Sequence, residues 1–144
     1  MVSEQDVIKS CACHKVRMAA RAITRAYDDA LRPTGLRATQ LAVLVAVAVA
    51  DAISITSLAN SLGMDRSSLT RTLGPIEKDG LVVLGTEGWR RSRTLRITAK
   101  GHAVMREALP LWEKAQSNLK RKLGNADWSL VTDGLDRLIR AGQA

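Results

Sequence analysis

The sequence predicts a mainly α-helical fold with one small β-hairpin, built as a single domain of six helices. Three observations predict this class. The length of 144 residues fits one domain, since domains commonly run to about 100–200 residues. Apolar residues recur at helical spacings of three and four over most of the chain, and only two short stretches favour strands. Aromatic residues are scarce, with three Trp, one Tyr and no Phe, so aliphatic side chains supply the core.

The first predicted helix covers residues 10–31, where apolar or small residues recur every three or four positions. Pro33 and Gly35 end it. The second helix begins near residue 38 and carries the apolar run of residues 41–50. This run of ten residues is shorter than the roughly 20 residues that a transmembrane helix needs. It therefore predicts a buried core helix and no contact with a membrane.

Two short helices are predicted in the middle of the chain. Residues 53–55 are too few for more than a very short extended segment. Thr56 is expected to cap a short helix that ends at Gly63, and Asp65 to cap a second helix that runs to about Lys78. The interior face of the second helix is Leu69, Leu73 and Ile76.

A β-hairpin and two more helices complete the predicted fold. Residues 81–84 and 94–97 form the strands, with turn-like basic residues 85–92 between them. Thr98 caps a long helix over residues 99–123, in which a proline at position 110 should produce a kink.

The final helix is expected over about residues 127–141 and carries an apolar stripe at 3, 4, 3 spacing. This stripe predicts a contact between two copies of the chain or, alternatively, packing within one chain. Contact between copies is favoured, because the terminal helices of so small a domain have little else to bury against. The stripe consists of Trp128, Val131, Leu135 and Leu138.

Two short helices joined by a tight turn and followed by a basic ribbon are the parts of a winged helix-turn-helix. Gly63 allows the turn, and the small Ala59 lets the second helix cross the first. The exposed face of the second helix carries hydroxyl and basic side chains, which bond phosphates and base edges in the major groove. The predicted DNA-binding residues of this helix are Arg66, Ser67, Ser68, Thr70, Arg71 and Lys78.

The charge distribution agrees with double-stranded DNA as the partner. The chain has 22 Lys and Arg against 14 Asp and Glu, a net charge of +8. Eight basic and four acidic residues lie between Thr56 and Gly101, so this segment carries half of the net charge. Arg90, Arg91 and Arg93 at the hairpin fit a narrow minor groove. A merely solvated surface is disfavoured, since the arginines coincide with the helix-turn-helix and hairpin.

Residues 65–82, DRSSLTRTLGPIEKDGLV, and residues 90–101, RRSRTLRITAKG, resemble the recognition helix and wing of the MarR family of bacterial transcription regulators. The resemblance covers nearly the whole chain. It implies a homodimer in which residues 1–34 and 102–144 form intertwined dimerisation helices and residues 35–101 form the winged lobe. Two such lobes would read a pseudo-palindromic operator. A repressor is the favoured role, and an activator is the alternative.

The wing departs from the family pattern. Gly88 or Trp89 stands where relatives usually have an aspartate that braces the arginine at the wing tip. The wing is also one residue shorter than in the relatives, so the resemblance does not specify its geometry.

The resemblance also implies positions that sense an effector. Relatives that sense organic hydroperoxides carry a reactive cysteine in the first helix and a hydrogen-bonding tyrosine further along it, and Cys13 and Tyr27 match these positions. A helix amino terminus and the nearby Lys15 and Arg17 would stabilise the Cys13 thiolate, the form that peroxides oxidise. Cys11 is the second redox candidate.

Three other interpretations of this region stay open. Cys11 and Cys13 can be small apolar residues that pack at a dimer interface. Cys11, Cys13 and His14 can bind a metal, although zinc requires four ligands and the only other histidine is His102. The resemblance implies a third alternative, in which a small aromatic or phenolic acid binds between the dimerisation helices and the winged lobe. No resident cofactor or metal is predicted.

Other functional classes find less support. The sequence lacks a Gly-rich phosphate loop, a catalytic triad and a metal-spaced set of side chains, so an enzyme is not predicted. A protein-interaction module and a sequence-indifferent architectural DNA-binding protein are the remaining alternatives. Glu4 and Asp6 lie near the amino terminus, where no apolar run follows, so no secretory signal is expected and a cytoplasmic location is predicted.

Overall fold

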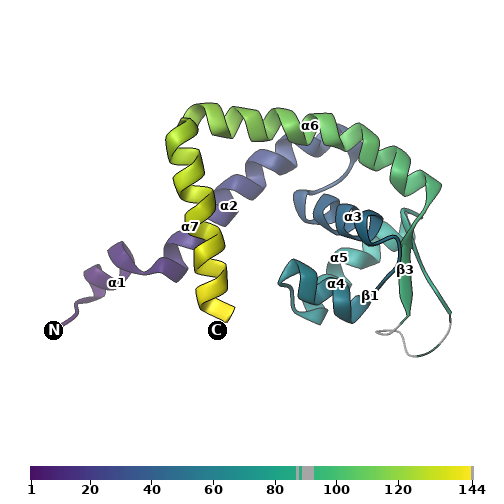
Figure 1. Cartoon of the computed structure of the whole chain (residues 1–144), viewed down its shortest axis with the longest axis horizontal. Helices are drawn as coiled ribbons and strands as arrows, with labels where there is room; N and C mark the ends of the chain where they lie inside the picture. The colour runs from purple at the N-terminus through teal and green to yellow at the C-terminus, as the bar shows by residue number, and fades with distance from the viewer. Residues whose placement is uncertain (87, 89–92, 144) are drawn as a thin grey trace.

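The computed structural model describes residues 1–86, 88 and 93–143, and it shows a mainly helical fold with a small antiparallel sheet (Figure 1). The predicted fold class is confirmed, with seven α-helices among the described residues where six were predicted. In chain order the elements are α1 (Glu4–Ser10), α2 (Ala12–Leu31), the 3-10 helix η1 (Arg32–Thr34), α3 (Ala38–Ala50), β1 (Ile53–Ser54), α4 (Ile55–Leu62), α5 (Arg66–Lys78), β2 (Val82–Leu84), β3 (Thr94–Ile97), α6 (Ala99–Leu123) and α7 (Asn125–Gln143).

The helices are arranged as a long arm and a lobe (Figure 1). Helices α2 and α6 contact one another along the arm, α7 folds back from the end of α6, and α1 extends beyond the start of α2. Helices α3, α4 and α5 and the sheet form the lobe near the beginning of α6. Helix α3 contacts both α2 and α6, so it joins the lobe to the arm.

The hydrophobic core lies mainly in the lobe. The strand order is β1-β3-β2, with Ile53 of β1 and Leu84 of β2 both opposite Leu95 of β3. The short extended segment predicted at residues 53–55 is therefore a third strand, β1, beside the hairpin. The side chains that are almost completely buried in the lobe are Val43, Leu44, Val47, Leu58, Leu69, Leu73, Ile76 and Leu95.

Helix α3 carries the apolar run that the sequence assigns to the core. Leu41 and Leu44 are buried, whereas Val49 near the end of the helix is 83% exposed. Asp51, which has a left-handed φ of 63°, ends the helix. Among the described residues, no single helix is both long and apolar enough to cross a membrane; a pair that joins α2 to α3 meets the length and composition only with a bend of 73°.

Local sequence explains the boundaries of α4 and α5. Ser54 caps α4, and its hydroxyl accepts the Ser57 N–H at 3.1 Å. The prediction that Thr56 is the cap was wrong, because the chain already leaves the extended conformation after Ser54. Gly63, with φ 62°, ends α4, and Asp65 caps α5, both as predicted.

The helix predicted over residues 10–31 is α2, which begins at Ala12, and a separate helix, α1, precedes it. Ser3 and Asp6 form a capping box, in which the Ser3 hydroxyl accepts the Asp6 N–H at 3.2 Å and the Asp6 carboxylate accepts the Ser3 N–H at 3.0 Å. This cap starts α1 several residues before the predicted helix. Cys11 has extended backbone angles, φ −64° and ψ 114°, and separates α1 from α2.

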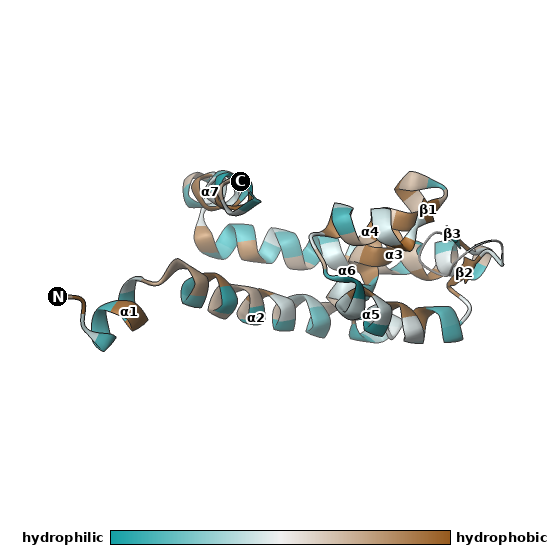
Figure 2. Ribbon diagram, turned by 90° about the horizontal axis from the view of Figure 1, so that it is seen from below, coloured by the Kyte–Doolittle hydropathy of each residue, from teal (hydrophilic) through white to brown (hydrophobic). Residues whose placement is uncertain are grey.

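The two carboxyl-terminal helices match their predictions closely. The Thr98 hydroxyl caps α6 and accepts the Gly101 N–H at 3.0 Å, and Pro110 lies within this helix. Helix α7 begins at Asn125, two residues before the predicted start, directly after Gly124. No described residue of α7 or α1 is buried, and Figure 2 shows apolar segments along both helices.

Candidate nucleic-acid interface and ligand pocket

Helix α5 has one face in the core and one face in solvent. Leu69, Leu73 and Ile76 are buried against the lobe. Of the six DNA-binding residues predicted on this helix, five are exposed and Ser68 is half-buried. Gly74 lies on the same outer side, with nothing within 4 Å of the position that a Cβ would take. The outer face is therefore unobstructed along its length.

The amino-terminal turn of α5 contains a network of hydrogen bonds centred on Asp65. Its carboxylate accepts the Ser67 hydroxyl at 2.7 Å, the Ser68 N–H at 2.8 Å and the Ser68 hydroxyl at 2.8 Å. The Arg71 guanidinium donates to the Ser68 oxygen at 3.3 Å. The Ser67 and Ser68 hydrogen bonds hold the pKa of the Asp65 carboxyl well below its usual range.

This network changes the interpretation of the two serines. Both hydroxyl protons are used by Asp65, so neither serine is a free donor for a phosphate. The Thr70 hydroxyl also donates internally, to the Arg66 carbonyl at 2.8 Å. In the described part of the chain, no hydrogen-bond partner is seen for the side chains of Arg66 and Lys78. With Arg71 they are the main donors that this face offers to an anion.

The end of α5 is joined to the beginning of α6. The Thr98 hydroxyl donates to the Gly80 carbonyl at 2.6 Å, and the Lys100 ammonium donates to the Asp79 carbonyl at 2.7 Å. Gly101 packs so closely on Leu81 that a Cβ would overlap the Leu81 carbonyl oxygen. Because the end of α5 is bonded to the beginning of α6 in this way, a movement of α6 would move α5 with it.

The structure describes both strands of the wing and, in the turn between them, residues 85, 86, 88 and 93. The predicted contacts Arg90 and Arg91, like Trp89, lie outside the described residues. The Arg93 guanidinium donates to the Gly88 carbonyl at 2.9 Å, so a backbone oxygen accepts this arginine where relatives are expected to use an aspartate. The guanidinium group of Arg96 in β3 lies 3.9 Å from the carboxylate of Asp51.

The redox candidates lie at the amino-terminal end of the arm. Cys11 is half-buried at the break between α1 and α2, and Cys13 is exposed in the first turn of α2. Tyr27 is fourteen residues further along α2, which is about 21 Å at 1.5 Å per residue. Within one protomer these side chains are therefore not brought together. Nor do the described residues contain a group of three or more His, Cys, Asp and Glu side chains placed to hold a metal ion.

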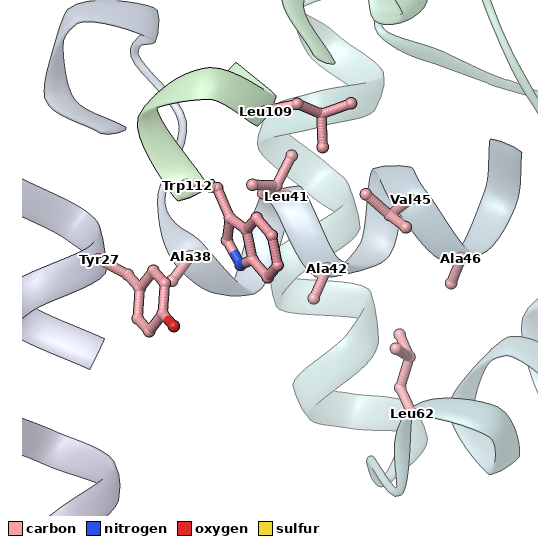
Figure 3. A pocket seen from close by; sticks show the side chains of 9 residues that line it. All are labelled: Tyr27, Ala38, Leu41, Ala42, Val45, Ala46, Leu62, Leu109 and Trp112. Carbon is pink, nitrogen blue, oxygen red and sulfur yellow. The ribbon is translucent and has the colours of Figure 1, made fainter. Parts of the chain in front are cut away.

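Tyr27 lines a pocket between the arm and the lobe, the region where the resemblance implies a bound small molecule; its other lining residues were not predicted from the sequence. Its hydroxyl donates to the Gln116 side chain of α6, and burial raises the pKa of Tyr27. The pocket has a volume of about 500 Å³ and lies between α2, α3, α4 and α6 (Figure 3). Its lining residues are Tyr27, Ala38, Leu41, Ala42, Val45, Ala46, Leu62, Leu109 and Trp112.

The apolar stripe of α7 is not part of the core of one chain. Val131, Leu135 and Leu138 are 46%, 38% and 44% exposed, and Trp128 is half-buried. Other exposed apolar side chains of the arm are Val7, Ile8, Val16, Met18 and Ile23.

Comparisons with known proteins agree on one family. Residues 36–83 match the family model described as MarR family. The transcriptional activatory protein BadR of Rhodopseudomonas palustris is 35% identical over 159 residues, which cover 97% of this chain and 87% of that protein.

Solved structures are similar over nearly the whole chain. The transcriptional regulator MosR of M. tuberculosis, solved in complex with DNA, superposes with a TM-score of 0.83 at 36% identity, covering 93% of this chain and 97% of that one. A cysteine-to-serine mutant of MarR from E. coli, solved with operator DNA, has a TM-score of 0.81 at 20% identity, covering 94% and 99% of the two chains, and shows the shared fold.

Proposed function

The chain belongs to the MarR family of transcriptional regulators, and we propose that it acts as a homodimeric repressor that binds a specific pseudo-palindromic operator in double-stranded DNA. The outer face of α5 carries this proposal. That face presents Arg66, Arg71 and Lys78 on a helix whose other face is fixed in the core. The DNA complex of MosR, at 36% identity, supports the same use of the lobe.

In this proposal α5 enters the major groove. Arg71 reaches base edges or phosphates, while Arg66 and Lys78 bind phosphates on either side. The wing arginines Arg90, Arg91 and Arg93 would follow the adjacent minor groove. The serines Ser67 and Ser68 and Thr70 would accept rather than donate, because their protons bond within the helix.

The proposed dimer follows from the uncovered apolar side chains of the arm. Helices α1 and α7 bury no residue within one protomer, and the stripe of α7 includes Leu135 and Leu138 at the spacing of a helix–helix contact. A second copy related by a two-fold axis would cover these side chains. It would also place two lobes on half-sites about 34 Å apart.

The test of the DNA claim is binding to duplex DNA selected from a random-sequence pool, followed by footprinting. Convergence on two half-sites about one helical turn apart supports a specific regulator. Failure to converge would establish the sequence-indifferent architectural binder instead. Transcription in vitro from a promoter containing the selected site then separates repression from the activation that the name of BadR describes.

Matched substitutions test the assigned surface. Arg71→Ala and Lys78→Ala should each weaken operator binding and reduce the slope of log affinity against log salt by about one. Lys114→Ala, which removes the same charge from an exposed position of α6, is the control. Equal effects of all three substitutions would remove α5 from the interface.

Two release mechanisms are proposed. The first is a small molecule in the pocket that Tyr27 and Trp112 line, which changes the angle between the lobes. BpsR of Bordetella bronchiseptica, which shares the fold at 18% identity and a TM-score of 0.78, has DNA binding regulated by 6-hydroxynicotinic acid. The second is oxidation of Cys13, which is exposed at the amino-terminal turn of α2. Hydroperoxide should release DNA from the wild type but not from Cys13→Ser; equal sensitivity would exclude Cys13.

A further inference from the structure

A second pocket, the arginine pocket, lies on the side of α2 that faces away from Tyr27. Arg25 and Tyr27 are two positions apart, so their side chains leave the helix about 200° apart. We propose that the arginine pocket binds a phosphate monoester of a small polyhydroxylated molecule, such as a sugar phosphate. This site goes beyond the proposed function and does not depend on it. The charged residues that line the pocket are Arg25, Asp28, Asp29, Arg32 and Arg37.

Three parts of the chain meet around the arginine pocket, where the arm joins the lobe. Arg25 belongs to α2, Arg32 to η1, and Arg37 to the segment that leads into α3. Gly35, with a left-handed φ of 74°, turns the chain between η1 and this segment. Leu36 is buried in the hydrophobic core and holds the segment in place. The pocket has a volume of about 420 Å³, which lies within the range of small-molecule sites.

The hydrogen bonds of the two aspartates leave an excess of positive charge in the pocket. Asp28 accepts the first backbone N–H of α3 at 2.7 Å, and Asp29 forms an ion pair with Arg32. Among the described residues, no ion pair is seen for Arg25 or Arg37. Two guanidinium groups from separate parts of the chain are therefore available to an anion. Their planar N–H groups match the oxygen atoms of a phosphate or a carboxylate.

The two carboxylates define the rest of the ligand. An ionised carboxylate only accepts hydrogen bonds, and it can accept about four of them, so Asp28 and Asp29 can each accept more. A ligand with negative charge along its whole length, such as a polycarboxylate or a nucleic-acid strand, would place an anion beside them, which is unfavourable. Hydroxyl groups can donate to them instead. The lining therefore fits a molecule with a dianionic phosphate at one end and hydroxyl groups at the other.

A ligand in the arginine pocket would connect the arm to the lobe. A phosphate held by Arg25 and Arg37 joins α2 to the start of α3, beside the bond that Asp28 already makes between them. Because a ligand of the folded state stabilises that state, the unfolding temperature should rise. At ten times the dissociation constant, glucose 6-phosphate should raise it by about 2–5 °C, whereas glucose should leave it unchanged.

The binding test is an NMR titration of the full-length protein at pH 7.5, where a phosphate monoester is mostly a dianion. The probes are glucose 6-phosphate, glucose and citrate, with KCl added to equal ionic strength. Glucose 6-phosphate should bind at least about 10-fold more tightly than glucose and about 3-fold more tightly than citrate. The amide signals of Gly35 and Ala38 should shift with it. Equal or tighter binding of glucose or citrate would overturn the proposal, as would the absence of binding at about 20 mM glucose 6-phosphate.

Matched variants assign the phosphate to the two arginines. Arg25→Gln and Arg37→Gln should each lower the affinity for glucose 6-phosphate about 3- to 10-fold. Arg17→Gln is the control, because it removes the same charge from an exposed position two turns earlier on α2. Unfolding temperatures without ligand verify that all three variants are folded. Equal affinities of the three variants would show a general effect of charge and would overturn the proposal.

One further variant tests the hydroxyl-bearing end of the ligand. Asp29→Asn removes a charged acceptor and releases Arg32, so the affinity for inorganic phosphate should stay the same or rise. The affinity for glucose 6-phosphate relative to inorganic phosphate should fall about 3-fold, because the sugar hydroxyls lose a charged acceptor. An unchanged ratio would overturn the assignment of a polyhydroxylated ligand.

Discussion

Ser68 links Asp65 to Arg71 in the hydrogen-bond network at the start of α5. Its hydroxyl donates to Asp65 and accepts from Arg71, so it fixes one guanidinium nitrogen near the helix surface. A preorganised arginine loses less conformational freedom when it meets a base edge than a freely rotating one. In the proposed DNA interface, Ser68 would therefore position Arg71 rather than donate a hydrogen bond to DNA.

Substitution of Ser68 tests this role. Ser68→Ala should weaken operator binding about 2- to 10-fold, because Arg71 loses a hydrogen bond that orients it, while binding to random-sequence DNA changes less. Ser129→Ala, at an exposed position of α7, is the control. Affinities measured by fluorescence anisotropy on both DNA types give the specificity ratio. An equal loss on both would show that Ser68 acts only through general helix stability.

Asp65 predicts a dependence of stability on pH. Its folded-state pKa lies below the ordinary value of 3.8, so the ionised carboxylate stabilises the fold fully above that value. This stabilisation is lost as the pH falls through the lowered pKa. Asp65→Asn keeps a helix cap without a titrating group. Urea unfolding should show a wild-type advantage that is constant above about pH 5 and shrinks at lower pH; a difference independent of pH would contradict the assignment.

The sequence predicted Asp65 as a cap but not the state of the serines beside it. The donor and acceptor roles of a hydroxyl depend on its rotamer and its neighbours, which residue spacing does not specify. Similarly, Tyr27 was assigned a sensing role on the face of Cys13. The structure shows its hydroxyl bonded to Gln116, which is distant in sequence.

At the scale of elements, the close approach of α6 to Leu81, the residue before β2, depends on Gly101. Gly101→Ala should lower the free energy of unfolding by about 1–3 kcal/mol, since the added methyl group overlaps the Leu81 carbonyl. Gly142→Ala, near the end of α7, has open space at its Cβ and should change stability by less than about 1 kcal/mol. Thermal and urea unfolding measure both. Equal stability of the two variants would mean that α6 can move away from Leu81 without lowering the free energy of unfolding.

Periodicity predicted the long elements well and the short ones poorly. Helices α3, α5 and α6 follow from apolar residues repeated over several turns, and the caps Asp65 and Thr98 were identified correctly. Strand β1 has only two residues, so its pairing with β3 depends on a contact more than 40 residues away that no local pattern records. Helix α1 was missed because its start depends on the single capping box of Ser3 and Asp6.

At the scale of the whole molecule, the proposed dimer predicts a coupling between α7 and DNA binding. The double variant Leu135→Asp and Leu138→Asp should be monomeric in sedimentation velocity, because it places charges in the apolar stripe. Its operator affinity should fall at least about 10-fold, since one lobe binds without the other. Arg137→Asp, on the opposite side of the helix by spacing, is the control. A double variant that stays dimeric would exclude this stripe.

The pocket shows why features that several elements form together were the hardest to predict from the sequence. Its walls come from residue 27, residues 38–46, residue 62 and residues 109–112, which belong to four separate helices. Leu109 and Trp112 share a helical spacing of three with one another, but nothing in the chain indicates which helix they face. Family resemblance suggested a ligand between the arm and the lobe, whereas the uncharged lining appeared only in three dimensions.

The uneven placement of buried residues gives the molecule two levels of stability. One core cluster joins the lobe to Leu31 of α2 and Ala108 of α6, while α1 and α7 bury nothing within one chain. In the proposed dimer, protection of the terminal helices would depend on protein concentration, whereas burial of the core cluster would not. Below the dissociation constant of that dimer, chains would have a folded core and exposed, protease-sensitive ends. Dilution of the protein would then increase proteolytic cleavage of α1 and α7 more than cleavage of the core elements.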